Sequence, residues 1–385
     1  MQAESSFIIL LVILSLGLII PELFRKLHLP FITGIILTGA ILGPSGTGVI
    51  ENDPVIEFFG FMGMIFLMLM AGIDTDIERL KKMRHKIFII AGFNGFIPFA
   101  TGFLIAFLFG YDLMTSVLAG VIFIASSVAI VISMLKDSKM YKKRIGQITA
   151  SSAIMLDAIG LMAITMILKE RETLKEVPYA LYLLLLLGSV MVVFYLLPKF
   201  TEFMFKHYLT SGNKNSELRL AIIVVMAVLA FFSLLDVHPV LSAFITGVTL
   251  SHIIKSEKLY SKIKTIGNTL FVPVFLFIVG MELDFSVLID VGNGTEIIIV
   301  FVIGIILSKL LSGFIGGRII KLSVKESALY GSASTIHLTT ALAVTYAARS
   351  MNLLDDVMMA AIISITIITT TLGPVLFRWV NAHVE

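Results

Sequence analysis

Long apolar runs separated by short polar breaks occupy the whole of the sequence. Most runs are close to the roughly 20 residues that a helix needs to cross the hydrocarbon core of a bilayer. The pattern therefore predicts an all-α polytopic membrane protein with thirteen transmembrane helices. The expected helices lie at residues 6–24, 30–49, 55–73, 87–109, 113–135, 145–168, 178–198, 218–235, 239–254, 266–283, 296–317, 326–348 and 356–377.

Composition agrees with this pattern and excludes several classes of function. Hydrophobic residues make up 58% of the 385 positions and charged residues 14%, whereas soluble domains are near half apolar and a quarter charged. The absence of cysteine excludes thiol nucleophiles and cysteine metal sites. The sequence has no phosphate-binding loop, zinc-ligand spacing or nucleophile–base pair, and its net charge of +3 is dispersed through short loops. We therefore expect neither an enzyme nor a nucleic-acid partner.

The loops between the expected helices alternate in charge. The even-numbered loops are mainly acidic or neutral, and most of the 29 Lys and Arg residues lie in the odd-numbered loops. Because cytoplasmic loops carry the excess of Lys and Arg, we expect the N-terminus outside and the C-terminus in the cytoplasm. The basic loops lie within residues 25–26, 79–86, 136–144, 199–219, 255–264 and 318–325.

Three segments recur in the same order at nearly one offset. Residues 30–36, PFITGII, resemble residues 239–245, PVLSAFI, 209 positions later. Residues 65–76, IFLMLMAGIDTD, resemble residues 274–284, VFLFIVGMELD, with Gly72 and Asp76 matched to Gly280 and Asp284 at an offset of 208. The same offset relates residues 125–127, ASS, to residues 333–335, AST. It spans seven helices, an odd number, so the two copies enter the membrane in opposite directions.

Inverted repeats are typical of secondary transporters, whose sites lie near the midplane at interrupted helices. Here the repeat pairs helices 1–6 with helices 8–13 and predicts that helices 5 and 12 are discontinuous and cross. Ser126 and Ser127 lie in the middle of helix 5, and Thr335 and His337 lie in the middle of helix 12. Small hydroxyl residues there can stabilise unwound backbone, although they can also be ordinary packing residues. Thr335 and His337 are further candidates for an ion site.

One carboxylate lies in the middle of the sixth helix. Asp157 is 13 residues after Arg144 and 12 before Lys169, so its short side chain cannot reach a polar surface. A lone aspartate at this depth costs about 2.5–3.5 kcal/mol on insertion scales. We therefore expect Asp157 to face a cavity and to bind either a proton or a dehydrated monovalent cation. Pairing with another helix is the alternative.

Lys309 is the other charge at depth. We expect it to pair with Asp157 or with the carbonyl ends of the broken helices, unless it extends part of the way to the surface. Ser152, five residues before Asp157, is expected to approach a bound ion. For His337 we favour a hydrogen-bonded role over a proton-linked one. Asn94 in the fourth helix is a weaker candidate.

These motifs resemble the membrane domain of the monovalent cation:proton antiporter-2 family over essentially the whole chain. Residues 30–44 resemble the family's helix-2 signature, and residues 66–76 its helix-3 signature. Residues 157–161, DAIGL, resemble the segment with the ion-binding aspartate, and residues 307–309, LSK, the segment with a membrane lysine. The resemblance implies exchange of Na⁺ for H⁺, with Li⁺ or K⁺ as other candidate ions, and no cofactor.

The resemblance also implies an architecture. The transporter unit, residues 1–385, is expected to form a homodimer in the cell membrane. Its core would move across the membrane as an elevator, carrying a site formed by Asp157, Ser126, Ser127 and Ser152 and supported by Lys309. The dimerisation or scaffold part would be residues 1–80 and 218–290, the ion-translocating core residues 87–168 and 296–380, and a linker helix residues 178–200.

Departures from the family keep alternatives open. Electrogenic members have a second aspartate before the binding aspartate and potassium efflux members a glutamine, whereas this chain has Leu156. Potassium efflux members also continue into a nucleotide-binding domain, whereas this sequence stops at Glu385. A single carboxylate favours electroneutral one-for-one exchange, provided that Lys309 keeps its charge. K⁺/H⁺ efflux is the alternative, and a sodium-coupled symporter of organic anions or a non-transporting sensor is more remote.

Overall fold

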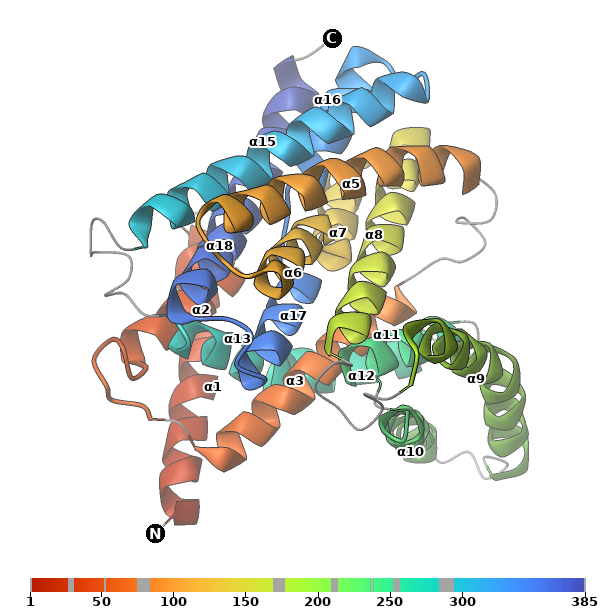
Figure 1. Ribbon diagram of the computed structural model, residues 1–385. Helices are drawn as coiled ribbons and strands as arrows, with labels where there is room; N and C mark the ends of the chain where they lie inside the picture. Colours follow the sequence, from red (N-terminus) through yellow and green to blue (C-terminus); the bar gives the residue numbers. More distant parts are fainter. Residues whose placement is uncertain are drawn as a thin grey trace.

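A computed structural model describes the chain as a bundle of α-helices (Figure 1). No strand occurs in the residues that it describes, which confirms the all-α fold. Within the described residues, eight helices are long and apolar enough to cross a membrane by themselves, so the chain is a multi-pass membrane protein. Pro30, Asp76 and Asp284 of the sequence repeat lie outside the described residues. Those residues are 2–26, 31–51, 53–74, 84–168, 177–208, 214–235, 237, 239–251, 257–283 and 294–383.

Each expected transmembrane segment contains a helix or a pair of helices. The helices before the middle of the chain are α1 (Gln2–Lys26), α2 (Phe31–Leu42), α3 (Pro54–Ile73), α5 (Arg84–Leu108), α6 (Leu113–Ile124), α7 (Val128–Asp137), α8 (Arg144–Leu168) and α9 (Tyr179–Tyr208). The later ones are α10 (Lys214–Ser233), α11 (Pro239–Leu250), α12 (Glu257–Ile266), the π-helical turn η2 (Gly267–Phe271), α13 (Val272–Met281), α15 (Thr295–Ile319), α16 (Val324–Ser334), α17 (Thr339–Ser350) and α18 (Asp356–His383).

Two expected helices are each broken into a pair. Extended residues 125–127 separate α6 from α7, and residues 335–338 separate α16 from α17, which confirms the predicted interruptions. The sequence reading was wrong about residues 257–266, which form α12 instead of a loop. That helix has no long apolar run, but Leu259 and Ile263, one turn apart, are both buried. It is an amphipathic helix that continues through η2 into the apolar helix α13, and Leu259–Met281 together form one candidate membrane span.

Close glycine contacts show the inverted symmetry of the fold. Helices α2 and α13 meet at Gly39 and Gly280, where a Cβ on either glycine would overlap a carbonyl oxygen of the facing helix. Helices α3 and α11 meet in the same way at Gly72 and Gly247. Gly39 and Gly247 are 208 residues apart in the sequence, and so are Gly72 and Gly280. The two helix contacts are therefore copies of one another, which supports the repeat inferred from the sequence.

The helices pack as two sets. One set contains α1, α2, α3 and α10–α13, and the other contains α5–α8 and α15–α18. In the second set, α5 and α15 lie side by side and cover the broken helices (Figure 1). Helix α9 lies at the edge of the molecule against α10 and α11 (Figure 1). The two sets touch where α11 meets α8, where α17 meets α3 and where α18 meets α2. Both interruptions therefore belong to one set.

Candidate functional site

The two broken helices meet at their interruptions. The backbone N–H of Ser127 donates to the carbonyl oxygen of Ile336 at 2.8 Å. The hydroxyl of Ser126 donates to the carbonyl oxygen of Ser334 at 3.4 Å. Ser126 and Ser334 are 208 residues apart, so a residue bonds its own equivalent in the other repeat. The pseudo-two-fold axis of the fold therefore passes through this crossing, where inverted-repeat transporters hold their substrates.

Helix α8 passes beside the first interruption and brings Asp157 to it. The Asp157 side chain is fully buried, and its Oδ1 accepts a hydrogen bond from the backbone N–H of Ser126 at 3.1 Å. The amide of Val128, the first residue of α7, also faces this carboxylate. The positive end of the α7 dipole therefore helps to stabilise a negative charge on Asp157.

Three buried oxygen atoms around the crossing have no hydrogen-bond partner among the described residues. They are Ser127 Oγ, Asp157 Oδ2 and Thr340 Oγ1. Leaving one such group buried and unpaired costs about 1–3 kcal/mol, and native structures contain few of them. One carboxylate oxygen with two neutral hydroxyls is a ligand set of hard oxygens, which suits a small monovalent cation. The arrangement can therefore hold a dehydrated cation or a proton at Asp157.

Thr340 was not identified from the sequence. It is the second residue of α17, directly after the second interruption, and its side chain is buried. Its methyl group lies near Gly160 of α8, where an added Cβ would be 3.9 Å from Thr340 Cγ2. Its position in the sequence could have identified it. A threonine at the start of a helix that follows a break has no carbonyl oxygen four residues earlier in the same helix to accept a hydrogen bond from its hydroxyl.

The other hydroxyls predicted for the site have partners elsewhere. The Ser152 hydroxyl bonds the hydroxyl of Tyr330 in α16. The Thr335 hydroxyl donates to the carbonyl oxygen of Ser332 at 2.8 Å. Both hydroxyls therefore have protein partners, unlike the three unpaired oxygens.

His337 lies inside the second interruption and joins elements around it. Its Nδ1 lies 2.8 Å from the carbonyl oxygen of Thr335 and its Nε2 lies 3.5 Å from that of Phe123, so the shorter contact favours the tautomer with the proton on Nδ1. Its backbone N–H donates to the hydroxyl of Thr369 in α18 at 3.1 Å. The favoured sequence interpretation, a hydrogen-bonded histidine, agrees with this geometry.

Lys309 of α15 stabilises the end of α6. Its fully buried Nζ donates to the carbonyl oxygen of Ile124, the last residue of α6, at 2.8 Å. It also donates to the backbone oxygen of Asn94 at 3.3 Å and to Asn94 Oδ1 at 3.4 Å. Its charge acts on Asp157 at longer range. Of the expected alternatives, the structure shows Lys309 bonded to a carbonyl end of a broken helix and not directly to the carboxylate.

Asn94 has a larger role than the sequence suggested. Its side-chain amide donates to the backbone oxygen of Lys309 at 3.2 Å. It also lies 3.0 Å from Ser312 Oγ and 3.1 Å from Ser334 Oγ. It therefore ties α5 to α15 and to α16 next to the crossing. A buried asparagine with all of these partners fixes the position of the Lys309 ammonium group.

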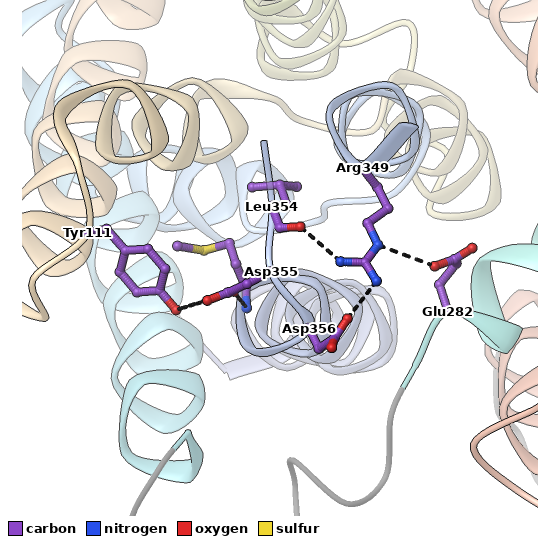
Figure 2. Close-up of polar contacts among 7 residues, drawn as sticks. Tyr111, Glu282, Arg349, Leu354, Asp355 and Asp356 are labelled. Atoms are coloured by element: carbon purple, nitrogen blue, oxygen red, sulfur yellow. Dashed lines mark hydrogen bonds and ion pairs between the residues drawn. The ribbon is translucent and has the colours of Figure 1, made fainter. Parts of the chain in front are cut away.

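A second charged cluster lies at the far end of α17 (Figure 2). Arg349 donates to the carbonyl oxygen of Leu354 at 2.9 Å and pairs with Asp356 at 2.6 Å. It also lies 3.7 Å from Glu282, which follows α13 in the other set of helices. Burial raises the pKa of Glu282; Arg349 opposes this shift, and the negative charges of Asp356 and Glu57 add to it. Arg349 thus forms an ion pair between the two sets of helices.

A hydrogen bond near this cluster joins two more loops. The Tyr111 hydroxyl, between α5 and α6, donates to the Asp355 carboxylate at 3.1 Å (Figure 2). Asp355 precedes α18, and Glu282 follows α13. The three loops that meet here are all even-numbered in the sequence analysis, so the structure brings together loops expected on one side of the membrane.

Comparison with known proteins shows that the chain is similar to sodium/proton exchangers in both sequence and fold. A family described as sodium/hydrogen exchanger, transmembrane, matches residues 10–382. The probable Na⁺/H⁺ antiporter 3 of Methanocaldococcus jannaschii is 28% identical over 382 residues, covering 97% of this chain and 96% of the relative. The Na⁺/H⁺-K⁺ antiporter GerN of Bacillus cereus is 26% identical over 381 residues, covering 98% and 97%. The solved structure of the sodium proton antiporter MjNhaP1 from M. jannaschii has the same fold, with a TM-score of 0.76 at 21% identity over 98% of this chain and 97% of that one.

Proposed function

Because the chain belongs to the family of transmembrane sodium/hydrogen exchangers, which are transporters and not enzymes, we propose that it exchanges Na⁺ for H⁺ at Asp157. The observation that carries this proposal is the group of unpaired oxygens at the helix crossing. A buried carboxylate oxygen without a partner in the described chain is costly unless something binds it. A proton or a dehydrated Na⁺ each satisfies it, and the ions are substrates that need no cofactor.

Exchange follows from competition for one carboxylate. A proton on Asp157 removes the charge that holds the cation, so the two ions cannot be bound together. Moving the charged Asp157 carboxylate through an apolar barrier is unfavourable. With either a proton or a monovalent cation bound, the negative charge of the carboxylate is neutralised. Only loaded forms therefore cross, and each cation that moves one way is matched by a proton that moves the other way. The ligands that we propose for the cation are Asp157 Oδ2 and Ser127 Oγ, with the Ser126 amide holding Asp157 Oδ1 in place.

Lys309 sets the stoichiometry in this scheme. Its ammonium group is held by the Ile124 carbonyl and by Asn94, neither of which is a proposed ligand of the cation. A lysine that keeps its charge leaves one proton exchanged per cation, which is electroneutral. If Lys309 instead released a proton when the cation bound, two protons would move per cation and the membrane potential would change the rate of turnover.

K⁺/H⁺ exchange is the second candidate. The relative from B. cereus is named for both Na⁺ and K⁺, so related sites differ in the ions that they take. Leu156, next to the binding carboxylate, matches neither the aspartate of electrogenic exchangers nor the glutamine of potassium efflux systems. Proton movement after pulses of Na⁺ and of K⁺ distinguishes the two candidates.

We propose an elevator movement for the alternation of access. The set α5–α8 and α15–α18 carries the complete site and would move against the set α1–α3 and α10–α13, with α9 as the linker. The few helix contacts between the sets and the single Arg349–Glu282 pair described between them are compatible with sliding. The first set would form the homodimer in the cell membrane. The loops of Tyr111, Glu282 and Asp355 would face the outside, as the charge alternation predicts.

The test is transport by purified protein in proteoliposomes that contain a trapped pH dye. Pulses of Na⁺, Li⁺ and K⁺ are given to wild type, to Asp157→Asn and to Asp137→Asn, a control at an exposed aspartate at the end of α7. We expect Na⁺-dependent proton movement in wild type and in the control but not in Asp157→Asn. Proton movement that is undiminished in Asp157→Asn would refute the proposed site. Absence of proton movement with any cation would refute exchange.

A further inference from the structure

The hydroxyl of Thr340 is unusual among the buried threonines of the described residues. Most of the others donate to the carbonyl oxygen four residues earlier in their own helix, as Thr345 does to Ala341 at 2.6 Å. Thr340 cannot do so, because the residue four positions earlier is Ile336, inside the interruption. The Ile336 oxygen already accepts the backbone N–H of Ser127. The break in the helix thus deprives the Thr340 hydroxyl of the partner that threonines ordinarily use. Further buried threonines with such bonds are Thr149, Thr165, Thr201, Thr246, Thr249, Thr366 and Thr370.

The surroundings of Thr340 direct its hydroxyl toward the ion site. Its methyl group is on the side of Gly160. Gly160 is three residues after Asp157, so the two lie on the same face of α8. The Thr340 hydroxyl is close enough to the Asp157 carboxylate to interact with it, but no hydrogen bond of ordinary geometry joins Thr340 Oγ1 to either carboxylate oxygen. Both side chains are buried, and an ion that bound both oxygens would satisfy them together.

We infer that Thr340 Oγ1 is a ligand of the transported cation, so that the second broken helix contributes directly to the site through α17. This inference rests on the proposed binding of the cation at Asp157. The ligands then come from three elements: Ser127 before α7, Asp157 in α8 and Thr340 in α17. Thr340 distinguishes the two substrates, because its lone pairs bind a cation whereas a proton on Asp157 needs only the carboxylate itself. Loss of this oxygen should weaken cation binding more than proton binding.

The experiment compares Thr340→Val, Thr340→Ser and Thr345→Val in the full chain. Valine keeps the shape of threonine and removes the hydroxyl, serine keeps the hydroxyl, and Thr345 is an equally buried threonine of the same helix with an internal partner. The measurements are the KM for Na⁺ and the maximal rate in proteoliposomes, and the rise in Tm that Na⁺ produces in detergent. We expect Thr340→Val to raise the KM about tenfold or more, the effect of one lost interaction with a charged ligand, and to reduce the Na⁺-dependent rise in Tm.

Serine at position 340 and valine at position 345 should retain the wild-type KM and the wild-type response of Tm to Na⁺. A Thr340→Val protein with wild-type KM, in a preparation where wild type exchanges Na⁺ for H⁺, would overturn the role of Thr340 and leave the proposed function intact. A wild type whose proton flux ignores every cation would overturn the proposed function and the ligand role together. A Thr340→Val protein that loses maximal rate while its KM and its Na⁺-dependent Tm shift are unchanged would show a structural role only, which also contradicts the inference.

Discussion

The two repeats of this protein have the same framework and different chemistry. Both contain a broken helix, and the two close glycine contacts between the repeats are related to each other by the offset of 208 residues. The buried charges are not reproduced. The position 208 residues after Asp157 is Ile365, which is fully buried in α18, and the position 208 residues before Lys309 is Thr101.

This difference explains how a symmetrical framework makes a single asymmetrical site. The crossing of two broken helices supplies unpaired backbone and hydroxyl groups from both repeats. A carboxylate from one repeat and an ammonium group from the other then act on opposite sides of that crossing, at the start of α7 and at the end of α6.

The largest effect is expected where the repeats differ in charge. Lys309→Met removes the donor to the Ile124 carbonyl and to Asn94, and loss of one member of a buried charged network costs about 3–5 kcal/mol. We expect a large fall in Tm in detergent and loss of exchange in proteoliposomes. Thr101→Val, at the equivalent position, removes only a bond to the Ile97 carbonyl and should cost less than about 1 kcal/mol. Equal losses from the two variants would contradict the asymmetry.

The next effect tests the shared framework. Gly72→Ala and Gly280→Ala each place a Cβ against the backbone of a facing helix, and overpacking of this kind costs about 1–3 kcal/mol. Because the two positions are equivalent, we expect similar decreases in Tm. Gly92→Ala in α5 is the control, since its Cβ would meet nothing within 4 Å and alanine favours helix. A large decrease at one of the two equivalent positions and none at the other would mean that the contacts are not copies.

A smaller effect on stability is expected from the N-terminal caps of α6 and α16, and its pH dependence should differ between the two helices. The Asp112 carboxylate accepts the backbone N–H of Thr115 and of Met114 at the start of α6, whereas the uncharged Ser323 hydroxyl caps α16. The backbone bond from Thr115 is the main cause of the lowered pKa of Asp112. The stabilisation by Asp112 is therefore present above the pKa of an unfolded aspartate and is lost as the pH falls through the native value.

The measurement is the difference in Tm between wild type and each cap variant over a range of pH. Asp112→Ala should cost about 1 kcal/mol at neutral pH, and the difference from wild type should shrink in acid. Ser323→Ala should cost a similar amount without that shrinkage, because a hydroxyl does not titrate. Identical pH profiles for Asp112→Ala and Ser323→Ala would contradict this account of the caps.

The smallest effect is expected at the surface cluster. The Arg349–Glu282 pair is partly exposed, so it contributes less than about 1 kcal/mol. Glu282→Gln should therefore change the turnover rate by less than about fivefold. Burial raises the pKa of Glu282, so as the pH falls this carboxylate becomes neutral earlier than an ordinary glutamate and the pair is lost. The turnover rates of wild type and Glu282→Gln should therefore become equal at acidic pH. A difference between the two rates that increases at acidic pH would contradict a role for the Arg349–Glu282 ion pair.

The sequence predicted most of the fold because hydrophobic length and the inverted repeat are local signals. Every expected apolar segment contains helix, and both interruptions lie where the repeated small residues are. Asp157 and Lys309 were proposed as site residues because a charge far from any polar flank is conspicuous in the sequence, and the structure places both of them next to the first interruption. Spacing along α8 brought Ser152 into the expected site, but the competing hydroxyl of Tyr330, 178 residues away, could not be read from that spacing.

The remaining site residues depend on how distant segments cross. The partners of Asn94 in α15 and α16 are 215 to 240 residues away in the sequence. Thr340 looks like any other threonine of a membrane helix until the break before it removes its carbonyl partner. An unpaired hydroxyl is a property of the assembled crossing, so no local pattern reveals it.

The central claim is that the cation binds among Ser127 Oγ, Asp157 Oδ2 and Thr340 Oγ1. The most direct test is anomalous scattering from crystals of the protein soaked with thallium(I), a heavy monovalent cation, with Asp157→Asn crystals as the control. We predict one strong peak per protomer within bonding distance of these three oxygens, and no peak there in Asp157→Asn. A peak at Ser152 or beside Arg349 and Glu282, or a peak at the crossing that persists in Asp157→Asn, would contradict the account.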